Sequence, residues 1–167
     1  IQRGCSFFFP AEVMGAHVGP KKCHITGRTI NIDMRCAVAF FGHMGIEMDP
    51  RDLDDKEMIT LTAALSLHKK YREFIHSAEL IRLEHNQVNS SFALVTEDKN
   101  LALYSFNQIC ESKRYLPSRL KFIGIKPNTQ YKIELIWPLK LEQYSLSVLD
   151  KIHGQVFSGE VLIPDHE

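Results

Sequence analysis

Two acidic side chains have a spacing that could serve glycoside chemistry. Glu47 and Asp49 lie two residues apart in an alternating segment, Gly45–Asp49, that stops at Pro50. On a strand, this spacing places both carboxylates on one face, with Cα atoms about 6.5 Å apart. Glycosidases hold two carboxyl groups about 5 to 9.5 Å apart across the bond that they cleave. The sequence nevertheless favours a simpler interpretation, in which Asp49 caps the turn before Pro50 and Glu47 is a solvated or ion-paired acid.

A histidine stands at the end of a second short segment, Gly15–Gly19, just before Pro20. A histidine at a strand end followed by turn residues is well placed to line a ligand site, and His17 is our candidate. Taken alone, the sequence favours a histidine that satisfies loop carbonyls. His17, Cys23 and His24 could gather around zinc, but their spacing fits no familiar zinc pattern and a fourth ligand is missing. We therefore predict no metal site.

Other motifs of catalysis are missing from the sequence. There is no GxSxG elbow, no GxGxxG turn and no phosphate-binding lysine loop, so we predict no cofactor. Arg28 could pair with a carboxylate and pin its loop, and we favour that structural role. Trp137 is the only tryptophan. It could stack on a sugar, although a core or inter-domain anchor is the more frequent role of a lone tryptophan.

The elements that must position these residues change in character near residue 85. Before that point the sequence pattern predicts mixed α/β structure, with a strand ending at Val18, a second strand at Gly45–Asp49 and a helix at Asp54–Ser77. Asp54 and Glu57 form a capping-box pattern at the start of that helix. Periodicity alone cannot say whether the apolar run Ile32–Phe41 is a strand or a buried helix.

From about His85 the hydrophobic period becomes two, which predicts an antiparallel β-sandwich. Turn residues separate the predicted strands, which are Ser91–Glu97, Leu101–Asn107, Leu120–Ile125, Tyr131–Trp137 and Tyr144–Leu149. We therefore expect two domains, residues 1–84 and residues 85–167.

Composition narrows the class of partner. The 167 residues carry 20 Lys and Arg against 20 Asp and Glu, and this zero net charge argues against nucleic-acid or anionic-membrane binding. No apolar run approaches the roughly 20 residues of a membrane-spanning helix. The four cysteines contain no CxxC pair, which favours reduced thiols in a cytoplasmic protein. The chain is also too short for a whole (β/α)8 barrel of about 250 residues.

The order of motifs in the first fifty residues resembles the later barrel portion of the melibiase-type α-galactosidases, glycoside hydrolase family 36. The family has similar IQxG…YFYP, G-[AS]-H-V and N-H-x-T-G-R segments, followed by R-x-x-V-A-x-F-G-x-x-G-Y-E-L-D. The matching segments here are Ile1–Gly4, Phe7–Pro10, Met14–Val18, Cys23–Arg28 and Arg35–Asp49. The second half is similar through Val95–Lys99, Leu120–Ile125 and Phe157–Glu160. The chain departs from the family pattern at Cys23 and Ile46, where asparagine and tyrosine are usual.

The resemblance implies a fold made of the last βα units of a TIM barrel followed by an antiparallel β-sandwich. Met14–Val18 would be the seventh barrel strand and Gly45–Asp49 the eighth. Ile32–Phe41 would then be the seventh helix, which resolves its ambiguity, and the capped helix after Asp54 the eighth.

The resemblance also implies a C-terminal fragment of a retaining enzyme that hydrolyses terminal α-galactosides such as melibiose and raffinose-type sugars. The family's nucleophile and acid/base are aspartates that lie before the matched segment, so no catalytic residue is assigned and the fragment alone should be inactive. His17 is the only predicted substrate-binding residue, because barrel active sites lie at the carboxyl ends of the strands.

Two other functional classes remain open at this point. One is a sandwich module that binds carbohydrate or a partner without chemistry of its own, and another is a different glycoside hydrolase with a related barrel. Because a partial barrel leaves apolar faces uncovered, we also expect the isolated chain to oligomerise or swap segments.

Overall fold

The computed structural model describes residues 2–111, 113, 120–138 and 151–162, which fall into two units. The first unit contains residues 2–77 together with residues 136–138, and the second contains the other described residues. The division at 77/78 precedes β3 (Glu79–His85), whereas the domain boundary expected at 84/85 falls at the end of that strand. No helix within the described ranges is long and apolar enough to cross a membrane.

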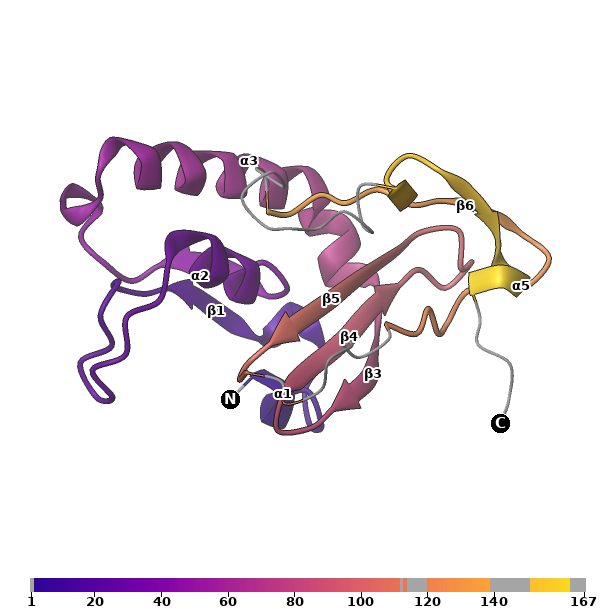
Figure 1. Ribbon diagram of the computed structural model, residues 1–167, viewed down its shortest axis with the longest axis horizontal. Helices are drawn as coiled ribbons and strands as arrows, with labels where there is room; N and C mark the ends of the chain where they lie inside the picture. The colour runs from indigo at the N-terminus through magenta and orange to yellow at the C-terminus, as the bar shows by residue number, and fades with distance from the viewer. Residues whose placement is uncertain (1, 112, 114–119, 139–150, 163–167) are drawn as a thin grey trace. The chain divides into compact units, whose positions relative to one another are not determined.

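The first unit is built around a βαβ motif (Figure 1). Its elements, in chain order, are α1 (Gln2–Cys5), η1 (Ala11–Val13), β1 (Gly15–Val18), α2 (Ile32–Ala39), β2 (His43–Ile46), η2 (Pro50–Asp52) and α3 (Asp55–Ser77). β1 and β2 pair in parallel, with Gly15 opposite His43 and Val18 opposite Ile46. α2 connects the two strands and contacts β1, β2 and α3. A parallel pair joined by a helix is the expected α/β arrangement for the first part of the chain.

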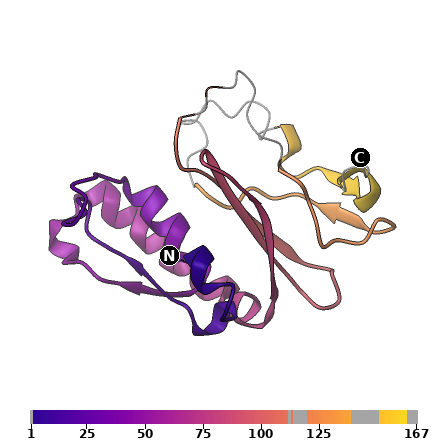
Figure 2. The ribbon, with the colours of Figure 1, turned by 90° about the horizontal axis from the view of Figure 1, so that it is seen from below.

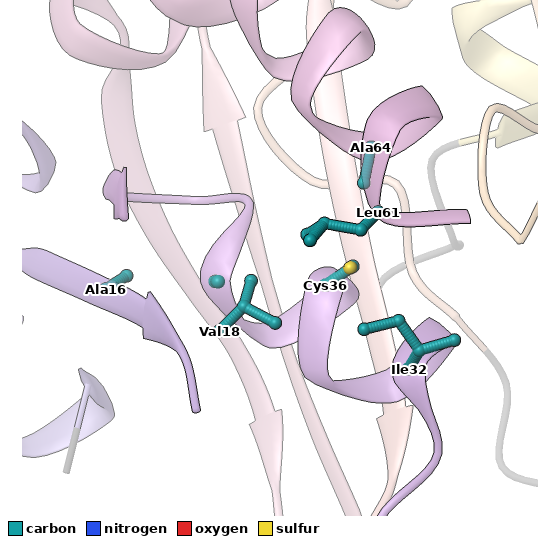
Figure 3. Close-up of a cluster of buried hydrophobic side chains, with 7 residues drawn as sticks. Ala16, Val18, Ile32, Cys36, Leu61 and Ala64 are labelled. Carbon is teal, nitrogen blue, oxygen red and sulfur yellow. The ribbon is translucent and has the colours of Figure 1, made fainter. Parts of the chain in front are cut away.

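Side chains from β1, α2 and α3 converge to form the core of the first unit (Figure 3). The buried members are Ala16, Val18, Ile32, Cys36, Ala39, Leu61 and Ala64. Trp137 packs against this cluster, and its indole Nε1 donates a 2.9 Å hydrogen bond to the carbonyl oxygen of Asp33. The predicted role of Trp137 as a core anchor is confirmed, although the residue does not lie in a strand.

Both long helices of the first unit begin at side-chain caps. Asn31 Oδ1 accepts a 2.9 Å hydrogen bond from the Met34 amide at the start of α2. At α3, Asp54 Oδ1 accepts from the Glu57 amide at 2.8 Å, and Glu57 Oε2 accepts from the Asp54 amide at 3.5 Å. The capping box predicted for α3 is confirmed, and the ambiguous run that starts at Ile32 is a helix.

The second unit contains an antiparallel sheet and a separate strand pair (Figure 2). The sheet has the order β3–β4–β5, where β4 is Asn89–Val95 and β5 is Ala102–Gln108. The pair consists of β6 (Gln130–Lys132) and β7 (Val156–Ser158), and β7 is followed by α5 (Gly159–Leu162). β4 lies in the centre of the sheet, and its Ala93, Leu94 and Val95 are buried.

Several strand predictions for the second unit need correction. The predicted strands at 91–97 and 101–107 correspond to β4 and β5, but β3 was not predicted. Residues 120–125 form no strand, because Gly124 has a φ of +95° and lies against the Ile81 and Val95 side chains. Of the strand predicted at Tyr131–Trp137, only Tyr131 and Lys132 lie in a strand, β6. The predicted strand at 144–149 lies outside the described residues.

Candidate functional site

His17 projects from β1 on the side away from the core. Along β1 the exposed and buried residues alternate, so Ala16 and Val18 face the helices while His17 faces the other way. The His17 side chain is 51% exposed and lies one residue before the carboxyl end of the strand. The structure therefore leaves this imidazole accessible to a ligand, as a substrate-contacting role requires.

A glycine on the neighbouring strand makes room for this ring. His17 pairs in register with Gly45 of β2. A Cβ atom built on Gly45 would lie 2.7 Å from His17 Cδ2 and 3.3 Å from Nε2. Because real Cβ atoms do not approach other heavy atoms so closely, any larger residue at this position would have to displace the imidazole. From the sequence alone, Gly45 is only a residue of a predicted strand. Its role in making room for His17 depends on the register of β1 and β2, which the sequence does not give.

Glu47 follows β2 and lies beside His17. Its Oε2 is 3.8 Å from His17 Nδ1, an ion pair whenever the histidine is protonated. Its amide donates a 3.1 Å hydrogen bond to the Val18 carbonyl, which extends the pairing of the two chain segments past the end of the strands. The structure thus brings His17 and Glu47 together at the carboxyl ends of β1 and β2.

The carboxylate pair considered for Glu47 and Asp49 is not formed on one strand face. β2 starts at His43 and ends at Ile46, so both acids lie beyond it. Asp49 instead caps η2 by accepting a 2.9 Å hydrogen bond from the Arg51 amide, as the simpler interpretation predicted. The Arg51 guanidinium also donates to Asp49 and holds the pKa of that carboxyl below its usual value.

The loop between β1 and α2 carries Cys23, His24 and Arg28. Its arms are joined by a bridge between Lys22 and Thr29 and by a 2.9 Å hydrogen bond from the Cys23 amide to the Arg28 carbonyl. No carboxylate lies within ion-pair distance of Arg28 in the part of the chain that the structure describes. Those residues also contain no group of three or more histidines, cysteines or acids that could hold a metal ion.

One charged residue beneath this face is not among the site residues predicted from the sequence. Arg35 lies within the apolar run that forms α2, and its side chain is buried. A lone arginine in such a run is a usable signal, since an unpaired buried charge is strongly unfavourable and must find partners.

The chain matches known proteins over most of its length. Residues 1–78 match the family model Melibiase. The chain is 39% identical over 139 residues to an α-galactosidase of Escherichia coli, in an alignment that covers 81% of this chain and 19% of that protein. It is 30% identical over 133 residues to the bifunctional α-galactosidase/sucrose kinase AgaSK of Mediterraneibacter gnavus, covering 78% of this chain and 14% of that protein. The chain thus spans about a fifth or less of the curated relatives it matches.

Solved structures agree with the sequence matches. The galactosidase domain of AgaSK superposes on 99% of this chain and 22% of that one, with a TM-score of 0.80 and 27% identity. A variant of the family 36 α-galactosidase AgaA from Geobacillus stearothermophilus, in complex with stachyose, superposes on 99% of this chain and 21% of that one, with a TM-score of 0.82. At 24% identity this second likeness concerns the fold alone. The family model, the sequence relatives and the AgaSK domain together show that the chain is similar to the melibiase-type α-galactosidases.

Proposed function

We propose that this chain works as part of a longer retaining α-galactosidase that hydrolyses terminal α-galactosides such as melibiose and raffinose-type sugars. The observation that carries the proposal is the pair of parallel strand ends that presents His17, in a chain 39% identical to an α-galactosidase. In this proposal His17 contacts the sugar, and the two carboxylates that perform the chemistry come from the remainder of the enzyme.

The proposal assigns a place in the enzyme to each part of the chain. Residues 1–84 would close a TIM barrel, with β1 and β2 as its seventh and eighth strands and α2 and α3 as the matching helices. Residues 85–167 would form the β-sandwich that follows. The parallel βαβ motif supports the first assignment, and the antiparallel pairing of β4 with β5 supports the second. A TIM barrel offers its active site at the carboxyl ends of its strands, which is where His17 lies.

Two further properties belong to the same proposal. All four cysteines are free thiols, which supports a reducing, cytoplasmic location. Phe7, Phe8 and Phe9 are exposed by 57 to 82%, which supports oligomerisation of the isolated chain, because large apolar side chains favour burial. A monomeric mass in light scattering at high dilution would contradict the second property.

Hydrolysis of an aryl α-galactoside tests the proposed activity. The longest natural protein that contains this chain should release the aryl group, and the 167-residue chain alone should not. Stoichiometric turnover by the isolated chain would overturn the proposal that the two catalytic carboxylates lie in the remainder of the enzyme. A fully inactive longer protein whose residues 85–167 nevertheless bind galactosides would favour the non-catalytic sandwich module instead.

A further inference from the structure

Arg35 lies at the centre of a polar cluster inside the first unit. Its side chain is only 6% exposed, and it enters from α2 beneath the carboxyl ends of β1 and β2. The guanidinium has three partners among the described residues, and each comes from a different segment of the chain. A rigid planar group with several donors is suited to holding separate segments in a fixed relation.

Two of these partners belong to the loops that leave the strands. Arg35 Nη1 donates a 2.8 Å hydrogen bond to the carbonyl oxygen of Gly19, two residues after His17. The same nitrogen lies 3.3 Å from Met48 Sδ, one residue after Glu47. One nitrogen therefore contacts both segments that carry the polar groups of the candidate site.

The third partner anchors the guanidinium to α3. Arg35 Nη2 lies 3.3 Å from Glu57 Oε1, and the same oxygen is 3.3 Å from Lys21 Nζ. The Glu57 carboxylate is itself fixed by the capping box at the start of α3, where its other oxygen accepts from the Asp54 amide. Glu57 is 13% exposed, so this pair is well shielded from water and from screening by salt.

We propose that Arg35 is a positioning residue for the proposed reaction. It acts through the loops after β1 and β2, and holds His17 and Glu47 in the relation that a sugar would meet. The inference rests on the proposed function. The inference goes beyond the proposed function because it gives Arg35, a buried residue that touches no substrate, control over the geometry of the loops that surround the site. A displacement of about 1 Å in such groups can lower turnover about a hundredfold.

The effect on the loops is measured in the 167-residue chain itself by hydrogen exchange. Arg35→Met removes the charge and every donor. It should speed exchange of two hydrogen-bonded amides by about tenfold or more: that of Glu47, which donates to the Val18 carbonyl, and that of Ile30, which donates to the Lys21 carbonyl. Arg35→Lys keeps the charge facing Glu57 but loses the planar fork, and should give an intermediate change. The matched control is Arg72→Met on the exposed face of α3, where these amides should keep their parent rates.

The effect on the reaction is measured in the longer enzyme. Arg35→Lys should lower kcat/KM for an aryl α-galactoside at least tenfold, while its melting temperature stays near that of the parent. Since removal of the buried charge could prevent folding of Arg35→Met, Glu57→Gln serves as a second variant. It keeps an oxygen for the capping box and removes the charge that Arg35 faces, and it should change loop exchange and kcat/KM in the same direction.

The outcomes separate this inference from the proposed function. If the parent enzyme hydrolyses the aryl α-galactoside and Arg35→Lys keeps parental kcat/KM, the inference is overturned even if the loops exchange faster, since Arg35 is then only structural. Unchanged loop exchange in both Arg35 variants also overturns it. A parent enzyme without hydrolysis overturns the proposed function. Faster loop exchange in that case would still show that Arg35 holds these segments.

Discussion

His17 keeps its place because its neighbour on β2 has no side chain. The imidazole lies over Gly45, and a Cβ there would meet its Cδ2 at 2.7 Å. His17 is half exposed, so its ring can move away at little cost in stability. Position 45 therefore affects the site more than the fold.

Gly45→Ala should displace the His17 ring while changing the free energy of unfolding by no more than about 1 kcal/mol, because alanine also restricts the unfolded chain. NMR of the His17 ring protons measures the displacement, and urea unfolding measures the stability. The control is Gly19→Ala, since a Cβ at Gly19 would meet nothing within 4 Å. An unchanged His17 spectrum in Gly45→Ala would contradict the placement of the ring.

Cysteine environments differ sharply within the first unit. A hydrogen bond from the Thr26 side chain lowers the pKa of Cys23, whereas burial raises the pKa of Cys36 to about 11. At neutral pH the Cys23 thiol should therefore be alkylated well before Cys36, which should react only after unfolding. Thr26→Val should slow the reaction of Cys23 and leave that of Cys110 unchanged. Peptide mass spectrometry after timed alkylation measures both rates, and early labelling of Cys36 would contradict its burial.

Among the elements, α3 shows what the sequence alone could predict. Its start follows from the Asp54–Glu57 capping box and its length from the apolar stripe, and both signals are local. β3 was missed because it follows α3 with neither glycine nor proline between them. Its Leu80, Ile81 and Leu83 also suit a continuing helix, and its pairing with β4 supplies the missing information. The contact between His17 and Glu47 escaped prediction for a similar reason, since it depends on the register between two strands.

The middle of α3 carries a histidine whose protonation should weaken the fold. His68 is buried, and its Nε2 is 3.0 Å from the Gly42 carbonyl, which requires a proton on that nitrogen. Burial is the main cause that lowers the pKa of His68, with smaller effects from His76, Arg72 and His43. The unfolded chain therefore binds a proton at His68 more readily than the folded chain does.

The free energy of unfolding should consequently fall as pH drops below about 6.5, the usual histidine value, and level off below the folded pKa of His68. His68→Gln keeps an amide donor for the Gly42 carbonyl but does not titrate, so it should flatten this part of the profile. His24→Gln, in the loop after β1, should keep the parent slope. Urea unfolding between pH 5 and 7.5 measures all three proteins. A parental slope in His68→Gln would assign the pH dependence to other groups.

At the scale of the whole molecule, the two units of the structure do not match the two halves of the sequence, because residues 136–138 belong to the first unit. Trp137 follows β6 in the β-rich half, yet its indole packs on the core of the first unit and bonds to Asp33. Local sequence patterns could not reveal this return, because it joins residues 104 positions apart. The single tryptophan consequently reports on the α/β unit and not on the strands that precede it.

Unfolding followed by tryptophan fluorescence tests this division. Leu61→Ala empties part of the core beside Trp137 and should lower the stability read by fluorescence by about 2 to 5 kcal/mol. Leu94→Ala removes a side chain of the same size that is equally buried in β4 of the second unit. It should lower the stability of that unit, as hydrogen exchange of the β4 amides would show, and leave the fluorescence midpoint in urea near the parent value. Equal shifts of that midpoint in the two variants would mean that the units unfold as one, since a cavity in either would then weaken the surroundings of Trp137.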